Sequence, residues 1–234
     1  MLPRAAKLRV MSEPSDSELL QRARQGDGIL FGTLVRRHDR YLYRLARSVL
    51  ADDHEAEDVV QLTFIKAYTQ LAQFRGEASL RTWLGRITLN EAVRRRPMRR
   101  ALVPLGAIDE ANERDRSRIH LSSLVGPDPE RAAAQAQIRK RLERAIDDLP
   151  PAFRAVLILR DVEEISGEEA ATLLGIQPET VRTRLHRARR MLREALGEQL
   201  ASALKDAFPF ERSRCDRLVE RTLNQVGLMP ALAP

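Results

Sequence analysis

The spacing of apolar residues limits this chain to a helical fold. Side chains such as Phe31, Leu34 and Val35 recur three or four positions apart, whereas the alternation typical of strands is nearly absent. Because about 3.6 residues make one helical turn, each such repeat predicts a helix with one apolar face. The pattern continues along most of the chain, so we expect an all-α protein.

Capping and breaking residues divide the first part of the chain into four helices. We expect these helices over residues 19–25, 29–50, 55–72 and 80–96. Asp16, Asp52 and Ser79 are the expected N-caps, because short polar side chains accept hydrogen bonds from the free amides of a first turn. Pro97 ends the fourth helix, since proline lacks an amide donor and clashes with the preceding turn. Residues 16–98 are therefore expected to form a four-helix domain.

The rest of the chain divides into a linker, a second domain and a tail. Residues 99–130 are charged and small, with several prolines and glycines, which is typical of a flexible linker. Helical periodicity returns over residues 131–198, the expected second domain. Residues 199–234 form a tail whose last helix starts near Asp216, and we expect this helix to pack on the second domain. Residues 1–15 are expected to be a disordered arm.

The net charge indicates what kind of molecule the protein binds, and the cysteine content indicates the cellular compartment in which it is found. Lysine and arginine number 40 against 33 acidic residues, and a net charge of +7 favours a polyanionic partner. Cys215 is the only cysteine, which excludes an internal disulfide and is typical of the reducing cytoplasm. No apolar run reaches the ~20 residues that span a bilayer, so no membrane insertion is expected. Translation starts at Met1 or at Met11, and the sequence does not distinguish the two.

Residues 166–178 carry the signals of a helix-turn-helix. Ser166 and Glu169 have the spacing of a capping box, in which hydroxyl and carboxylate each accept a hydrogen bond from the other's backbone amide. Gly175 suits the left-handed conformation that closes a helix, and Pro178 suits the first turn of the next one. Two helices joined by a tight turn are therefore expected here.

The second helix of this motif has two distinct faces. An apolar stripe that can pack on the first helix consists of Val181, Leu185, Ala188 and Leu192. The opposite face carries Arg182, Thr183, His186, Arg187 and Arg190. A helix of this kind fits the major groove, where arginine bonds guanine O6 and N7. An arginine-rich solvated helix is the alternative, but the capping signals, the turn and the separated faces together favour DNA binding.

Four segments in this order resemble the extracytoplasmic-function sigma factors, the smallest members of the sigma-70 family of bacteria. The segments are Ala56–Phe64, Phe74–Ser79 followed by Thr82–Leu84, Leu149–Arg154 and Thr180–Arg189. The resemblance covers residues 16–196. It implies that the first domain is sigma region 2, that the second is sigma region 4, and that the chain directs RNA polymerase core to promoters.

The resemblance also implies roles for particular residues. Asp58 and Gln61 match the motif that docks on the clamp of the largest polymerase subunit. The residues expected to bind the −10 element, where a flipped base needs an apolar wall and polar contacts, are Phe74, Arg86, Asn90, Arg94 and Arg95. The residues expected to read the −35 element are Arg182, Thr183, His186, Arg187 and Arg190. The second domain is also expected to contact the flap of the second-largest subunit, and an anti-sigma protein is an expected partner.

Some of these residues have structural alternatives. Phe74 is equally compatible with a place in the core, Trp83 is better explained as a core residue, and Asp58 by itself would pass for a surface residue. Arg94 and Arg95 belong to an arginine cluster with Arg96, Arg99 and Arg100, for which phosphate binding is favoured over a solvated helix end.

Two other classes of function remain as alternatives. One is a helix-turn-helix regulator that binds operators without polymerase core. The other is an enzyme acting on nucleic acid, which the scattered histidines and unpaired carboxylates disfavour. We expect no catalytic residue, no cofactor and no metal. The sequence leaves open the target promoters, the inducing signal and the roles of the tail and Cys215.

Overall fold

The computed structural model describes residues 14–76, 78–95, 129–196 and 208–228. Within these ranges the regular secondary structure is entirely helical, which confirms the all-α expectation. Nearly all of the expected arm and linker, together with Arg96, Pro97, Arg99 and Arg100, lies outside the described residues. Their roles remain predictions.

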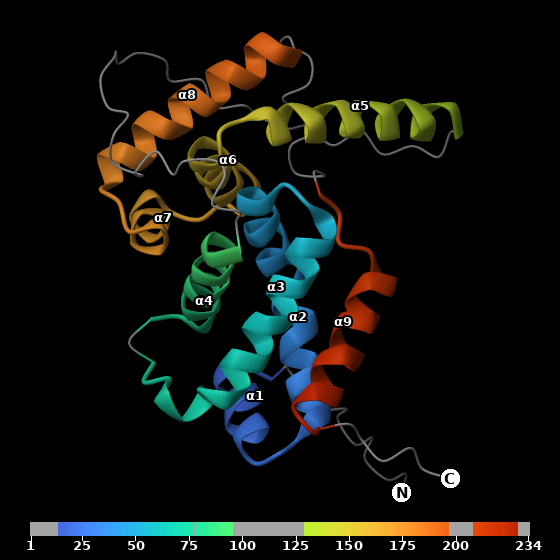
Figure 1. The fold of residues 1–234 in the computed structure, drawn as a ribbon, viewed down its shortest axis with the longest axis vertical. Coiled ribbons are helices and arrows are strands. Elements are labelled where there is room, and N and C mark those ends of the chain that lie inside the picture. Colours follow the sequence, from blue (N-terminus) through green and yellow to red (C-terminus); the bar gives the residue numbers. More distant parts are fainter. Residues whose placement is uncertain (1–13, 77, 96–128, 197–207, 229–234) are drawn as a thin grey trace, which may run out of the picture.

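The first part of the chain folds into a helical module that we call module 1. Its elements are α1 (Asp16–Arg24), α2 (Gly28–Leu50), α3 (Asp53–Thr69), the 3-10 turn η1 (Leu71–Gln73) and α4 (Leu80–Arg95) (Figure 1). The helices α2, α3 and α4 pack on one another, and α1 packs on α2. Ser79 accepts a hydrogen bond from the Thr82 amide at 3.1 Å, as expected of the cap of α4. Ser15 rather than Asp16 caps α1, in a reciprocal capping box with Glu18.

The second module, module 2, contains the predicted helix-turn-helix. Its elements are α5 (Pro129–Asp148), α6 (Pro151–Leu157), the π-helical turn η2 (Ile158–Val162), α7 (Gly167–Leu174) and α8 (Pro178–Leu196). The Ser166 hydroxyl accepts a hydrogen bond from the Glu169 amide at 3.1 Å. Gly175 is left-handed, with φ of 65°, and ends α7 as predicted. The Glu169 carboxylate accepts a hydrogen bond from the Thr82 hydroxyl of module 1 at 2.8 Å, so the reciprocal half of the expected capping box is replaced by a contact between modules.

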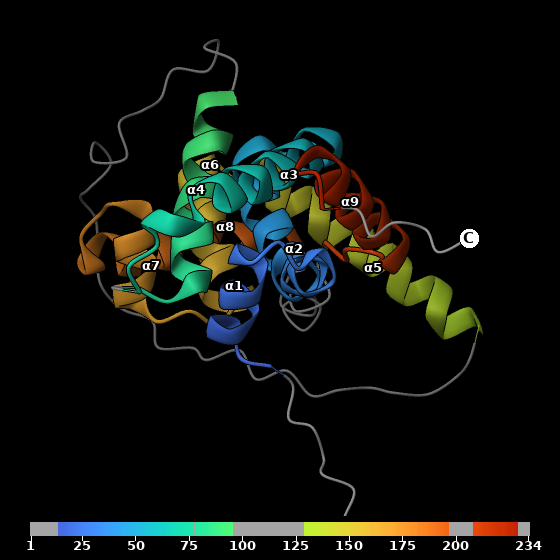
Figure 2. The ribbon, with the colours of Figure 1, turned by 90° about the horizontal axis from the view of Figure 1, so that it is seen from below.

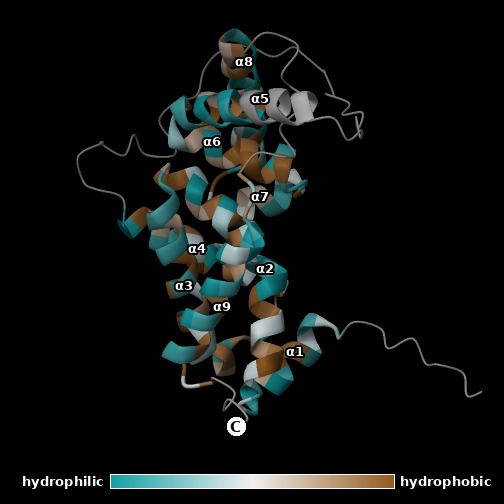
Figure 3. Cartoon of the chain, turned by 90° about the vertical axis from the view of Figure 1, so that its right-hand side faces the viewer, coloured by the Kyte–Doolittle hydropathy of each residue, from teal (hydrophilic) through white to brown (hydrophobic). Residues whose placement is uncertain are grey.

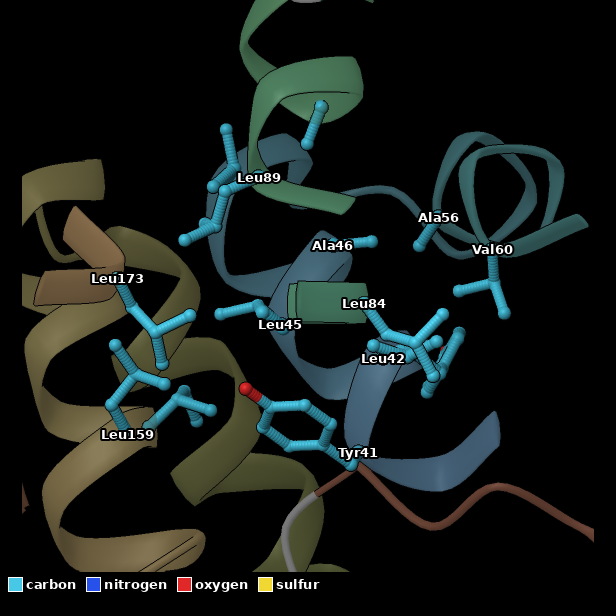
Figure 4. Close-up of a cluster of buried hydrophobic side chains, with 14 of the residues drawn as sticks. Tyr41, Leu42, Leu45, Ala46, Ala56, Val60, Leu84, Leu89, Leu159 and Leu173 are labelled. Atoms are coloured by element: carbon cyan, nitrogen blue, oxygen red, sulfur yellow. The ribbon is translucent and has the colours of Figure 1, made fainter. Parts of the chain in front are cut away.

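The two modules pack directly on each other. Helix α6 lies against α2, and α7 lies beside α4 in both Figure 1 and Figure 2. In Figure 4, Leu159 and Leu173 of module 2 face Tyr41 and Leu45 of module 1. Gly85 of α4 permits this approach, because a Cβ atom there would lie only 3.1 Å from the Leu173 side chain of module 2. The buried apolar side chains of both modules consequently form one continuous cluster.

Buried charges accompany the apolar contacts between the modules. Glu163 of module 2 pairs with two arginines of module 1, Arg44 at 3.1 Å and Arg81 at 2.7 Å. Arg154 donates to the backbone oxygen of Ser48 at 2.6 Å. A carboxylate that is only 9% exposed loses its water, and its two arginine partners compensate for that loss. These pairs therefore fix how the modules sit on each other.

The tail helix α9 (Arg212–Gln225) packs on module 1, against α2 and α3 (Figure 1). The expectation that it packs on the second domain was wrong. Its apolar face consists of the buried side chains Leu218, Val219 and Leu223. Figure 3 shows hydrophilic and hydrophobic residues alternating along the helices, as expected of amphipathic helices. Such a pattern predicts that a helix has an apolar face but not which surface covers it.

Candidate functional site

Helix α8 buries its apolar stripe and turns a mixed polar face outward. Val181, Leu185, Ala188 and Leu192 are all buried, as predicted from their spacing. Helix α8 packs on α6 and α7 through this side. The residues on the opposite side are therefore held by a rigid support, which a recognition helix requires.

The five predicted −35 residues share the outer side of α8 but differ in exposure. Arg182 and Arg190 are exposed, whereas Thr183, His186 and Arg187 are half-buried. The Arg190 side chain is 61% exposed and lies 3.6 Å from Glu194. The Thr183 hydroxyl donates to the backbone oxygen of Glu179 at 2.9 Å. The most accessible positive charges of this face are thus near its two ends.

Two other arginines of α8 are directed into the protein. Arg184 is 3% exposed, and its position three residues after Val181 and four before Ala188 places it beside the apolar stripe. Arg189 binds Asp161 of η2 through two hydrogen bonds, at 2.9 and 2.6 Å, and this contact raises the pKa of Arg189. The inward position of Arg184 follows from helical spacing, whereas the partner of Arg189 was not predictable from local sequence.

Helix α4 presents a second polar face. Arg86, Asn90 and Arg94 are exposed, and each lies four residues after the one before, so they line one side of the helix. The Arg94 side chain is 74% exposed and lies 3.4 Å from Glu91. Arg95 turns instead toward α3, 3.0 Å from Glu55 and 3.1 Å from Asp58. Four of the predicted −10 residues therefore lie on α4, and three of them share a face.

Phe74 lies in the turn between η1 and α4. Its ring is half-buried, and the ring centroid is 5.1 Å from that of Trp83. Both rings pack against the hydrophobic core. Arg24 donates hydrogen bonds to the backbone oxygens of Leu71, at 2.6 Å, and Phe74, at 3.2 Å, which ties this turn to α1. The aromatic pair thus has a structural role in this turn.

The two predicted polymerase-binding residues lie on α3 beneath the tail helix. The Asp58 side chain is 43% exposed, whereas Gln61 is only 9% exposed. Gln61 donates a hydrogen bond to the side-chain oxygen of Gln225 of α9 at 3.0 Å. An open groove lies between α3, α4 and α9, and Asp58, Gln61 and Arg94 are among its lining residues. The α3 surface and the polar face of α4 therefore adjoin.

Two properties of the described residues concern metal binding and the crossing of a membrane. No group of three or more His, Cys, Asp or Glu residues in these ranges could hold a metal ion. Among the same residues, none of the helices is both long enough and apolar enough to cross a membrane.

Two family models match the chain, one in each module. Residues 34–101 match sigma-70 region 2, and residues 139–192 match sigma-70 region 4. The first match overlaps module 1, and the second lies within module 2. The module that carries the α3 and α4 faces and the module that carries α8 therefore have separate counterparts in one family.

Curated relatives and a solved structure agree with these matches. The chain is 35% identical over 177 residues to the ECF RNA polymerase sigma factor SigE of Mycolicibacterium smegmatis, covering 74% of this chain and 64% of that protein. It is 33% identical to the RNA polymerase sigma-H factor of Pseudomonas aeruginosa, covering 85% of this chain and 100% of that protein. The fold is similar to that of CnrH, solved in complex with the cytosolic domain of CnrY, with a TM-score of 0.51, 27% identity, and coverage of 77% of this chain and 96% of CnrH. The chain therefore belongs to the sigma-70 family, among its extracytoplasmic-function RNA polymerase sigma factors.

Proposed function

We propose that this sigma factor binds RNA polymerase core through the surface of α3 and directs it to promoters that it reads with α4 and α8. The observation that carries the proposal is the outward face of α8, whose supporting stripe is fully buried while Arg182 and Arg190 remain accessible. A face held in this way is suited to the major groove. The proposed readers of the −35 element are Arg182, Thr183, His186, Arg187 and Arg190.

The polar face of α4 is the proposed reader of the −10 element. Arg86, Asn90 and Arg94 are exposed along one side of the helix, where they can contact phosphates and the edges of an unpaired base. Arg95 is proposed to contribute positive charge after release from Asp58. Phe74 contributes an aromatic wall only if its contact with Trp83 opens. The chain acts in this scheme without catalytic chemistry of its own.

Asp58 and Gln61 are the proposed contact with the polymerase clamp, and module 2 is the proposed contact with the flap of the second-largest subunit. The acidic residues Asp53, Glu55, Glu57 and Asp58 in the first half of α3 favour a basic partner. A regulatory protein partner of the anti-sigma type is also proposed. Its support is the likeness to CnrH, which was solved bound to part of another protein.

Binding to purified polymerase core tests this assignment. Replacing Asp58 and Gln61 together by alanine is expected to weaken core binding, measured by fluorescence anisotropy of labelled sigma factor. Glu220→Gln, on the exposed side of α9, is the control and is expected to bind as the unchanged protein does. A regulator that acts without polymerase would bind duplex DNA tightly and would form no complex with core.

A further inference from the structure

The tail helix α9 covers the surface that the proposed function gives to the polymerase. Gln61 bonds Gln225 of α9 at 3.0 Å, and Asp58 lies 3.6 Å from Arg221 of the same helix. Gln61 is consequently only 9% exposed. While α9 remains in this position, it covers most of the surface through which a second protein would contact the Gln61 side chain.

The side of α2 that faces α9 has two glycines that allow close approach. At Gly32 an added Cβ atom would meet Val219 at 3.4 Å and Leu223 at 3.5 Å. At Gly28 it would overlap the backbone oxygen of Leu228. Glycine lowers the stability of a helix, so its presence in α2 needs another explanation. The missing side chain leaves space in which a second helix can approach α2. Gly28 therefore leaves the space that the segment directly after α9 occupies, whereas Gly32 would tolerate a methyl group.

Charge complementarity holds α9 in a single orientation. Arg214 pairs with Glu57 of α3, and its guanidinium lies 4.8 Å from the ring centroid of Tyr43. Arg36 of α2 pairs with Asp216. Helix α9 carries four arginines, Arg212, Arg214, Arg217 and Arg221, and it lies on the acidic half of α3. The basic helix thus occupies the same acidic surface that is proposed to attract a basic region of polymerase.

We infer that α9 is an intramolecular inhibitor, which must leave the α3 surface before polymerase core can dock there. This inference rests on the proposed function, since it concerns the regulation of the proposed polymerase-binding site. The apparent dissociation constant of core equals that of the uncovered surface divided by the fraction of molecules in which α9 is undocked. If α9 is docked in about nine of every ten molecules, core binds about tenfold more weakly than it would to the uncovered surface.

Two variants release α9 from opposite sides without changing Asp58 or Gln61. Gly28→Ala places a methyl group against Leu228, and its matched control is Gly32→Ala, whose methyl group makes only ordinary contacts.

Val219→Glu combined with Leu223→Glu puts charges into the apolar face of α9, and its control is Glu220→Gln on the exposed face. Both α9-releasing variants are expected to bind core about tenfold more tightly than their controls. Circular dichroism on each variant checks that modules 1 and 2 remain folded.

The outcomes separate the inference from the function on which it rests. If the α9-releasing variants bind core with the same affinity as the controls, or more weakly, α9 is not an inhibitor although the sigma function stands. If neither the unchanged protein nor any variant binds core, the proposed function fails, and the inference fails with it.

A measurement on the unchanged protein gives an independent test. Cys215 lies in α9, half-buried, with its sulfur 3.9 Å from Arg36 of α2. Saturating core polymerase is expected to accelerate the reaction of Cys215 with a maleimide, scored by mass spectrometry of the labelled peptide. Labelling that is unchanged or slower in the complex would show that α9 stays docked, which overturns the inference.

Discussion

Arg47 of α2 binds Asp147 of α5 through two parallel hydrogen bonds, each 2.7 Å long. The same guanidinium donates to Asp53 of α3 at 2.6 Å, so it joins module 2 to two helices of module 1. Burial lowers the pKa of Arg47, but the contacts with Asp147 and Asp53 outweigh burial and raise it overall. A paired geometry of this kind restricts both distance and orientation. The two modules are therefore held together by a directional contact as well as by apolar packing.

Removing this contact should loosen the closed arrangement. Asp147→Ala leaves Arg47, whose side chain is 11% exposed, with one carboxylate partner in place of two. We expect the free energy of unfolding to fall by about 2 kcal/mol, measured by urea denaturation. Arg190→Ala, which removes an exposed pair with Glu194, should change it by less than about 0.5 kcal/mol. Equal effects of the two substitutions would contradict the role given to Arg47.

Promoter reading by α8 should respond to single arginine substitutions. Arg182→Ala and Arg187→Ala are each expected to reduce the use of promoters that depend on a −35 element, at a cost of about 1–3 kcal/mol where the arginine bonds a guanine edge. Core binding should be unchanged, because the proposed clamp contact lies on α3. Arg40→Ala removes the same charge from an exposed site on α2 and serves as the control. Loss of core binding in the α8 variants would contradict this division of roles.

The thiol of Cys215 should be unreactive while α9 is docked. Burial, followed by the neighbouring Asp39, raises the pKa of this thiol to about 12. The thiolate that reacts with iodoacetamide is therefore scarce between about pH 7.5 and 9.5. We expect alkylation slower than that of free glutathione in the unchanged protein, and faster alkylation when Val219 and Leu223 are both replaced by glutamate. Equal rates in the two proteins would mean that α9 does not protect Cys215.

Stability should decrease in mild acid because of His38. Burial lowers the pKa of His38 below its usual value of about 6.5, although Asp16, 3.0 Å away, opposes this shift. The unfolded chain therefore takes up a proton more readily than the folded protein. The contribution is present above about pH 6.5 and is lost as the pH falls below that value. Urea denaturation at several pH values should show this loss, and His38→Gln should reduce it; an unchanged pH profile in that variant would exclude His38 as the cause.

Local signals in the sequence predicted the helices and the turn of the helix-turn-helix correctly. Ser79, Ser166 and Gly175 act within three or four residues of their own position, and caps of this range are readable from sequence. The family motifs likewise predicted the membership in the sigma-70 family that the two regional matches show. The outward face of α8 followed from the same periodicity that predicted its buried stripe.

Contacts between distant segments were not predictable in this way. Asp147 lies 100 residues from Arg47 along the chain. The local sequence around each residue does not distinguish it from an ordinary charged residue on the surface. Glu169 has the spacing of a capping box but bonds Thr82 of the other module. The approach of α9 to α2 depends on Gly28, where a side chain would meet the backbone of Leu228, and sequence reasoning did not single out this glycine. The contacts between the modules and the docking of α9 therefore depend on tertiary packing, which local sequence signals do not reveal.

Run-off transcription with the purified chain and polymerase core tests the central claim most directly. Start sites are mapped on genomic promoter fragments, with core alone and with the Val219→Glu, Leu223→Glu protein in parallel. The account predicts initiation at a limited set of shared start sites that requires the chain, with more transcript from the variant. Transcripts that are the same with and without either protein would contradict the assignment of this chain as a promoter-directing sigma factor.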